Sequence, residues 1–337
     1  MSRDPDRLSR NEAHKRCEDI TGKKIIDIEF PGGRSRESWR IFFAENDSAI
    51  ATRRKDPFRA NLEIKVLKAL SKHNVPSPKL IATTDWKLFL QEDLKGKRLS
   101  KEIMYADEDK TERLLDSALN GLSQAQKAAS KESLDLQMPM IGAKKDWIIE
   151  LLERPYPIAE FFNESAPELN FRALYQTLRV YKPRFIKWDS RPGNAVVQED
   201  GSVAWYDWEH AGSRNRLDDV AWLITDEFVP NHPAVEARLL EKHLPIFADD
   251  KSLEDAKSYL MIYGTFHMLI RLGLMLHNKE EEDWWDIDYC IRKDKVGITL
   301  ECAQRTCLRA SRWAQHSPLT KELSPWLKKI EKKLETL

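Results

Sequence analysis

The chain has 337 residues, of which 41% are hydrophobic and 33% are charged, and its 55 Lys and Arg balance its 55 Asp and Glu. This length exceeds what one compact core usually holds, so it predicts two lobes or domains. The composition excludes a disordered, collagen-like or disulfide-rich class. A formal net charge of zero gives no overall attraction to nucleic acid or to an anionic membrane, and we expect neither as a partner.

The cysteine spacing and the length of the apolar runs indicate the redox state of the thiols and the location of the protein. None of the four cysteines forms a C-x-x-C pair, so we expect reduced, structural thiols. The first ten residues lack the apolar stretch of a signal peptide. The nearest candidate for a membrane span, residues 259–277, carries His267 and Arg271. We therefore expect a cytoplasmic protein.

The N-terminal third predicts a small antiparallel sheet. Residues 1–22 form a polar extension, for which a helix or a frayed segment are both open. Residues 23–94 then form a β-β-β-α-β-β lobe, expected to bind a nucleotide. Its expected strands are 25–28, 39–44, 48–53, 80–82 and 88–91, and apolar residues at helical spacing predict a helix over 61–71.

Residues 95–337 predict a larger, mainly helical lobe, so the fold class is α+β. A β-like island at 185–210 interrupts it, with strands 195–197 and 203–207 around the turn Q-E-D-G. The expected helices are 111–129, 145–152, 170–181, 220–227, 232–244, 253–277, 296–312 and 325–336.

The island holds a set of groups suited to phosphoryl transfer. It reads F-I-K-W-D-S-R-P-G-N-A-V-V, then V-A-W-Y-D-W-E. Asp189 and Asn194 lie on a loop that Pro192 and Gly193 keep from being helical, and the following hairpin should return Asp207 to the same end. One carboxylate would orient an attacking hydroxyl, while the amide and the other carboxylate would hold Mg²⁺. The alternative is that these are ordinary turn residues.

K-W-D-S-R-P-G-N followed by Y-D-W-E resembles the catalytic loop and metal-binding aspartate of the aminoglycoside phosphotransferase and choline kinase-like family. That family's usual pattern is H-G-D-x-x-P-x-N followed by I-D-W. The resemblance implies a protein kinase-like two-lobed fold, and a kinase that transfers the γ-phosphoryl group of ATP or GTP to a hydroxyl of a small acceptor. It makes Asp189 the catalytic base, and Asn194 and Asp207 ligands of Mg²⁺.

The same resemblance assigns nucleotide contacts in the N-terminal lobe. G-G-R-S would lay Gly32, Gly33 and Ser35 over the phosphates, although a plain tight turn fits it too. L-F-L-Q-E-D-L-K-G resembles the family's hinge. There the backbone around Gln91, Glu92 and Leu94 would meet the adenine.

A basic pair follows the third strand. In A-T-R, strand alternation places Ala51 and Arg53 on one face, and Arg53 takes the place of the family's phosphate-binding lysine with Glu63 as its partner. Arg54 is the competing choice if the register slips by one residue. A solvated basic turn is the plainer interpretation.

Two departures from the family pattern favour a second hypothesis, a catalytically degenerate binding protein. Lys187 stands where the family has His, and either points toward a phosphate or braces the loop. Trp188 stands where Gly or Arg is common, and Arg53 replaces Lys. By resemblance, Asp219 braces the catalytic loop. A protein kinase is not expected, because D-F-G and A-P-E are absent from the sequence.

The acceptor should be chosen by residues 228–337, where E-E-E-D-W-W-D combines carboxylates with indoles. That combination suits a cationic acceptor. The alternative is a solvated acidic segment with packed tryptophans. The candidate acceptor contacts are Glu209, Asp226, Glu227, Asp283, Trp284 and Trp285. The oligomeric state stays open.

Overall fold

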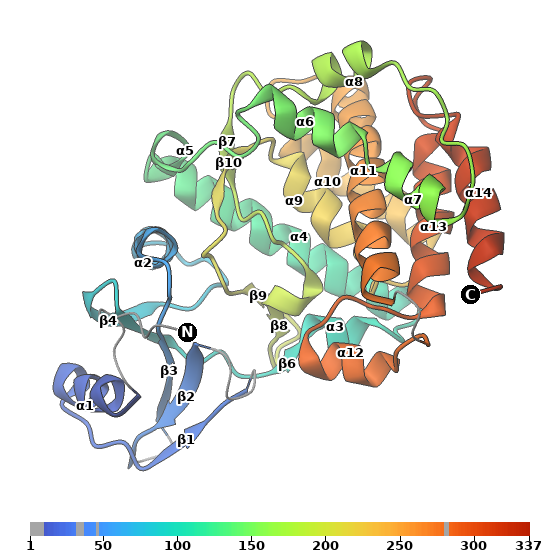
Figure 1. The fold of residues 1–337 in the computed structure, drawn as a ribbon. Helices are drawn as coiled ribbons and strands as arrows, with labels where there is room; N and C mark the ends of the chain where they lie inside the picture. Colours follow the sequence, from blue (N-terminus) through green and yellow to red (C-terminus); the bar gives the residue numbers. More distant parts are fainter. Residues whose placement is uncertain (1–9, 32–36, 45–46, 280–282) are drawn as a thin grey trace.

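The computed structural model describes residues 10–31, 37–44, 47–279 and 283–337. Its N-terminal part contains one five-stranded antiparallel sheet in the order β1-β2-β3-β5-β4 (Figure 1). The expected β-β-β-α-β-β order is confirmed. The elements are α1 (Arg10–Thr21), β1 (Asp27–Glu29), β2 (Ser38–Phe42), β3 (Ser48–Thr52), α2 (Pro57–Leu70), β4 (Leu80–Asp85) and β5 (Leu88–Glu92).

Local sequence explains the boundaries around β3 and α2. Thr52 ends β3, one residue earlier than expected, and Arg53 and Arg54 lead out of the sheet. Asp56 caps α2 by accepting a hydrogen bond from the backbone N–H of Phe58, and Pro57 occupies the first turn, where its missing N–H costs nothing. The helix therefore starts four residues before its apolar pattern does.

The remainder is the helical lobe, with strands β6, β8 and β9 at the edge nearest the sheet and the β7–β10 pair farther away, near α5 and α6 (Figure 1). Its strands are β6 (Lys97–Arg98), β7 (Arg184–Ile186), β8 (Ala195–Val197), β9 (Val203–Trp205) and β10 (Gly212–Arg214). Its helices are α3 (Leu99–Ile103), α4 (Glu108–Lys131), α5 (Leu134–Gln137), α6 (Lys145–Leu152), α7 (Pro155–Phe161), α8 (Phe171–Leu178), α9 (Leu217–Ile224), α10 (Pro233–Phe247), α11 (Leu253–Lys279), α12 (Ile287–Lys293), α13 (Leu300–Ala314) and α14 (Leu323–Leu334).

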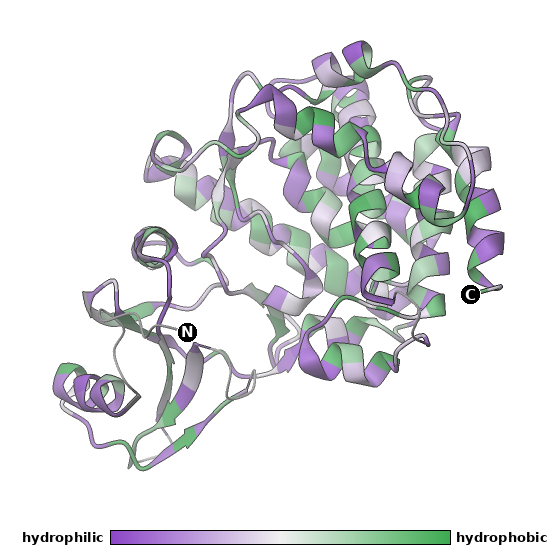
Figure 2. Cartoon of the chain, viewed as in Figure 1, coloured by the Kyte–Doolittle hydropathy of each residue, from purple (hydrophilic) through white to green (hydrophobic). Residues whose placement is uncertain are grey.

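Two apolar clusters hold the fold together. The smaller one lies under the sheet and includes Trp39, Ile41 and Leu90, with Cys17 of α1 packed against them. Residues 10–21 of the extension are thus a helix attached to the sheet. The larger cluster fills the helical lobe and also takes in the buried face of α2. In Figure 2 the hydrophobic colour is strong along the helices at the centre of this lobe, such as α11.

Helix α11 is long and apolar enough to cross a membrane by length and composition alone. However, 83% of its most apolar window is buried inside the protein. It packs between α9 and α13, and the buried Arg271 on it is neutralised by Glu227. The helix therefore forms the centre of the helical lobe.

Candidate active site

The catalytic loop runs from β7 through a short 3₁₀ turn at Pro192–Asn194 into the β8–β9 hairpin. The side-chain amide of Asn194 donates to Asp189 Oδ2 at 2.8 Å and to the Asp189 carbonyl at 2.9 Å. At the far end of the hairpin, the Tyr206 N–H donates to the Asn194 carbonyl at 3.1 Å. The expected hairpin thus returns Asp207 beside the loop, and Asp189, Asn194 and Asp207 lie at one site.

Asp189 is held in its ionised form. Its burial opposes ionisation, but the adjacent Arg191 guanidinium, whose Nε donates to Asp189 Oδ1 at 2.7 Å, and the ammonium of Lys187 outweigh that effect. The pKa of Asp189 consequently lies well below its usual range. A carboxylate fixed by an amide and a guanidinium can orient a hydroxyl. It can also accept the hydroxyl proton, which becomes more acidic as the oxygen begins to bond to phosphorus.

Asp219 braces the loop, as the resemblance implies. Its carboxylate accepts backbone hydrogen bonds from Lys187 and Trp188, both at 2.9 Å, and a hydroxyl hydrogen bond from Ser190. Full burial raises the pKa of Asp219 to about 6 despite these donors. Trp188 adopts φ +62°, a conformation that costs a non-glycine residue about 1–3 kcal/mol and suits the glycine common in the family.

Lys187 acts as a second brace. The side chain is fully buried, and its ammonium donates to the Asp207 carbonyl at 2.7 Å and lies 5.1 Å from the Trp208 ring centre. Burial lowers the pKa of Lys187, while Asp189 and Asp207 raise it. Of the two roles open for this lysine, the structure supports the brace, because its ammonium binds the backbone carbonyl of Asp207.

The basic residue that reaches the site is Arg54, which corrects the expected pairing of Arg53 with Glu63. Arg54 contacts Glu63 and Asp207 at 2.7 Å and Glu209 at 3.2 Å. Arg53 instead pairs with Glu37 at 2.7 Å. The alternation argument failed because β3 ends at Thr52, so neither arginine follows strand geometry.

Glu63 connects α2 to the segment that follows β9. It is fully buried and also accepts a hydrogen bond from the Trp208 N–H at 3.2 Å. Burial raises the pKa of Glu63 to about 7, and Arg54 opposes that rise. Arg54 and Glu63 thereby tie the small lobe to Asp207.

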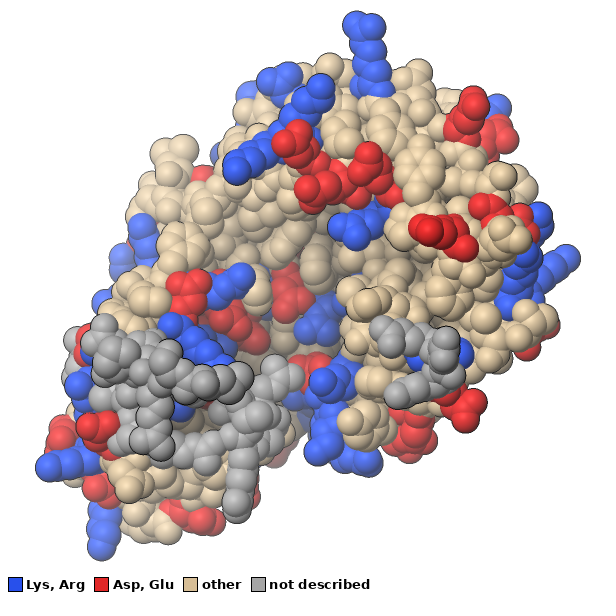
Figure 3. Space-filling view, in the orientation of Figure 1, with Lys and Arg blue, Asp and Glu red and all other residues tan. Residues whose placement is uncertain are grey.

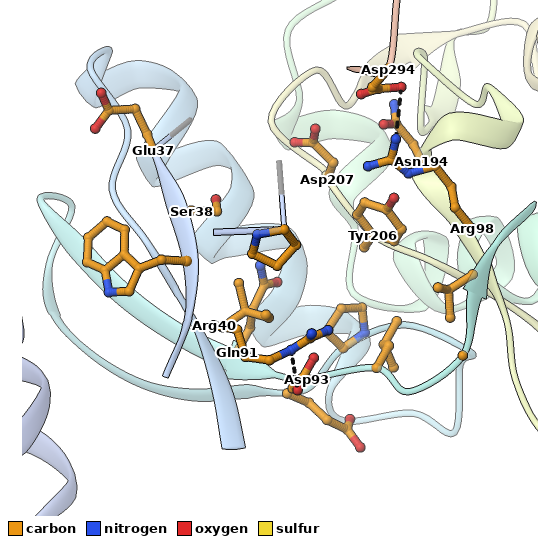
Figure 4. A pocket seen from close by; sticks show the side chains of 18 of the residues that line it. Glu37, Ser38, Arg40, Gln91, Asp93, Arg98, Asn194, Tyr206, Asp207 and Asp294 are labelled. Atoms are coloured by element: carbon orange, nitrogen blue, oxygen red, sulfur yellow. Dashed lines mark ion pairs between the residues drawn. The ribbon is translucent and has the colours of Figure 1, made fainter. Parts of the chain in front are cut away.

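A cleft of about 280 Å³ separates the sheet from the helical lobe (Figures 3 and 4). Gln91, Glu92 and Leu94 line it on the hinge side, and Arg54, Asn194 and Asp207 line it on the other. The hinge residues therefore border the cleft, and their contact with a nucleotide base stays a prediction. Gly32, Gly33 and Ser35 fall outside the described residues.

The described residues could hold a magnesium ion only if phosphate or water oxygens complete its coordination. Among the described residues, no three His, Cys, Asp or Glu side chains form a ready metal centre. Asn194 and Asp207 do line one cleft, and the amide NH₂ of Asn194 is used on Asp189, which makes its oxygen the suitable donor to a cation. Mg²⁺ keeps few protein ligands and takes the rest from phosphates and water. The residues present therefore match a metal that arrives with a nucleotide.

Sequence reasoning missed many of the residues that line the cleft, and Arg98 and Asp294 are two of them (Figure 4). Their side chains are 3.6 Å apart, and Asp294 follows helix α12, which the apolar pattern did not predict. A β-carbon added to Gly193 would lie 2.7 Å from Asp294 Oδ1. The C-terminal segment thus reaches the catalytic loop at the position where the family pattern tolerates any residue.

The expected acceptor contacts are only partly accessible. Glu227 is fully buried and bound bidentately by Arg271, and Asp226 is 1% exposed, so the structure removes both from the accessible surface. Glu209 is engaged by Arg54. Long-range ion partners such as Arg271 carry no local sequence signal, which is why these acids looked available.

The E-E-E-D-W-W-D segment is described from Asp283 onward. Asp283 is exposed, whereas Trp284 and Trp285 pack partly buried against the helical core. The Lys279 ammonium lies 5.3 Å from the Trp284 ring centre, and the Trp285 N–H donates to the Ile298 carbonyl. Packing accounts for both indoles, and acceptor binding by these three residues stays a prediction.

Comparisons with solved structures agree on the fold. A putative aminoglycoside phosphotransferase from Ralstonia eutropha JMP134 aligns with a TM-score of 0.56 at 11% identity, over 95% of this chain and 98% of that one. The GDP complex of an aminoglycoside 2'-phosphotransferase-IIIa mutant gives 0.53 at 15% identity, over 77% and 87%. The amicoumacin kinase hAmiN, in complex with AMP-PNP, Ca²⁺ and Ami, gives 0.53 at 11% identity, over 98% and 94%.

No curated protein sequence matches the chain. Residues 29–251, however, match the phosphotransferase enzyme family, APH. This range contains strands β2 to β5, the hinge, the catalytic loop and Asp207, and it ends after α10 and before α11. The chain therefore belongs to the APH phosphotransferase family, with the protein kinase-like fold of its structural neighbours.

Proposed function

We propose that the chain is a small-molecule kinase that transfers the γ-phosphoryl group of ATP or GTP, bound with Mg²⁺, to a hydroxyl of its acceptor. The observation that carries this proposal is that Asn194 and Asp207 line an interlobe cleft, while Asn194 donates a hydrogen bond to Asp189 and Lys187 donates one to the Asp207 carbonyl. Solved neighbours in complex with GDP or AMP-PNP support a nucleotide donor.

In this proposal each group has a distinct role. Asp189 orients the acceptor hydroxyl and takes its proton. The oxygen atoms of Asn194 and Asp207 hold Mg²⁺, which neutralises charge on the phosphate oxygens. Arg54 turns from the carboxylates toward the phosphates, since a guanidinium grips phosphate as readily as carboxylate.

The test separates turnover from nucleotide binding. Asp189→Asn should reduce nucleotide consumption by at least 10³-fold, across a panel of alcohols, amino sugars and amino alcohols, while ATP and Mg²⁺ still raise the melting temperature. Asp207→Ala should reduce nucleotide consumption and also abolish the metal-dependent shift, because it removes a proposed ligand of Mg²⁺. The shift is large enough to measure, since a ligand at 100 times its Kd stabilises the wild type by about 2.7 kcal/mol. Running GTP beside ATP identifies the donor. Unchanged turnover in both variants, or no shift of the wild type with either nucleotide, contradicts the proposal.

A further inference from the structure

Three tryptophans form a row beside the catalytic loop. The ring centres of Trp147 and Trp188 are 5.9 Å apart, and those of Trp188 and Trp222 are 5.3 Å apart, both pairs tilted. They come from α6, the catalytic loop and α9, and each ring is partly exposed. We call these three residues the tryptophan row.

The central member is placed at a conformational cost. Trp188 directly precedes Asp189, and its φ of +62° is one that glycine adopts freely and tryptophan does not. Strained backbone at a functional site points to a role for the residue that bears it. Packing of the loop alone does not require an indole there, because Asp219 already holds the Trp188 backbone N–H.

The row is fixed from behind. The Trp222 indole N–H donates to the Tyr263 hydroxyl at 3.2 Å, and the His267 ring lies 4.4 Å from that indole. The Arg214 guanidinium covers Trp147 at 4.6 Å. Because these partners are buried, the rings have little freedom to move, and a rigid aromatic surface binds a flat ligand at low entropic cost.

The acids closest to Asp189 on the helical side are already paired or buried. Glu227 is bonded to Arg271 and Asp189 to Arg191, and Asp226 is buried. Exposed acids do lie on α6, at Asp146 and Glu150. In Figure 3 the face of the helical lobe next to the hollow between the lobes is tan, with charged side chains above it and at its base. A polycation that reaches Asp189 itself would find indoles and carboxylates that are already paired.

We infer that the tryptophan row is the acceptor-binding wall, and that it selects a neutral acceptor whose flat aromatic or apolar face stacks on Trp188 and Trp222 while its hydroxyl reaches Asp189. This inference rests on the proposed function, since it assigns the acceptor class of that same site. It replaces the cationic acceptor suggested by the acidic segment around Asp283.

The test uses binding rather than turnover. The probe is 4-nitrobenzyl alcohol, a neutral aromatic alcohol that quenches indole fluorescence, titrated into the full chain with ADP and Mg²⁺. Saturable quenching is expected in the wild type, with at least tenfold weaker binding in Trp222→Ala and in Trp188→Gly. Trp188→Gly suits the local backbone, so misfolding does not explain its loss. Trp188→Phe should stay within threefold of the wild type.

Trp86→Ala, in the β4–β5 turn of the other lobe, is the matched control and should bind the probe like the wild type. Kanamycin, as a polycation, should compete poorly with the probe. The inference is overturned if the wild type shows no saturable binding, or if Trp222→Ala and Trp188→Gly bind the probe as tightly as the wild type does. The nucleotide-dependent melting shift is read in the same samples, so a shift that persists without probe binding refutes the acceptor class while leaving the kinase proposal intact.

Discussion

The two sides of the catalytic loop are built from different chemistry. On the sheet side, Arg54 joins Glu63, Asp207 and Glu209, and charges are paired across the lobes. On the helical side, Glu227 and Asp189 are paired with Arg271 and Arg191, and the partly exposed tryptophan row lies beside the loop. The phosphate side is thus held by charge pairing and the proposed acceptor side by aromatic packing, and both lie within the family match over residues 29–251.

The largest effect is expected from a substitution of Arg54. Arg54→Ala leaves Glu63 buried without its cation, and removing one partner of a buried pair costs about 3–5 kcal/mol of unfolding free energy. Nucleotide binding should weaken as well, because the same guanidinium faces the cleft. Chemical denaturation and the ATP-dependent melting shift measure the two effects.

The neighbouring arginine supplies the control for that experiment. Arg53→Ala removes a pair with Glu37 and leaves the Glu63–Asp207 connection in place. Its loss of stability should be less than half of that in Arg54→Ala, with the nucleotide shift retained. A larger effect at Arg53 than at Arg54 would return the phosphate contact to the residue that strand alternation favours.

This pair of arginines shows where sequence reasoning reaches its limit. The three-strand meander and the loop around Asp189 were predictable because hairpins and the D-x-x-P-x-N spacing are local. The end of β3 was off by one residue, which was enough to exchange Arg53 for Arg54. The pairing of β7 with β10 joins segments too short to carry a periodic pattern.

The hinge offers a second, smaller test of the sheet side. Gly96 has φ +131°, and an added β-carbon would lie 2.0 Å from the Val197 carbonyl oxygen. Gly96→Ala should therefore cost about 3 kcal/mol through strain and overpacking, and weaken nucleotide binding in the cleft that Gly96 lines. Gly201 is the matched control, because it has φ +83° and a β-carbon added there would have no atom within 4 Å. Gly201→Ala should cost only about 1 kcal/mol and leave nucleotide affinity unchanged. Equal losses in urea denaturation would show that the Val197 contact is readily relieved.

On the acceptor side, local pattern was a weaker guide. Asp226 and Glu227 were expected at the surface, yet Arg271 of α11, far along the chain, draws Glu227 into the core. Trp188 was noticed only as a departure from the family. Its neighbours Trp147 and Trp222 are separated from it by dozens of residues, so no spacing rule could assemble the row.

The smallest expected effect lies beneath that row and depends on pH. His267 is 2% exposed, and burial, followed by the nearby Arg271, lowers its pKa to about 3 from an ordinary value of 6.5. Below pH 6.5 the unfolded chain takes up a proton that the folded chain refuses, so this residue reduces stability as the pH falls toward 3. Between pH 7 and pH 5 that loss amounts to about 2 kcal/mol.

His267→Gln removes this titration while keeping a polar side chain beside Thr225. At pH 7 the variant should be less stable than the wild type, because it disturbs the support of Trp222. At pH 5 the difference should narrow by about 2 kcal/mol, since only the wild type bears the cost of a histidine kept neutral. Urea denaturation at the two pH values measures the change.

His316, a more exposed histidine with a smaller lowering of its pKa, is the control. For His316→Gln, the stability difference from the wild type should change far less between pH 7 and pH 5. A stability difference at His267 that stays constant between pH 5 and pH 7 would mean that the folded protein protonates this ring readily. The support beneath Trp222 would then be open to solvent, and the tryptophan row would lose the rigidity on which its stacking role depends.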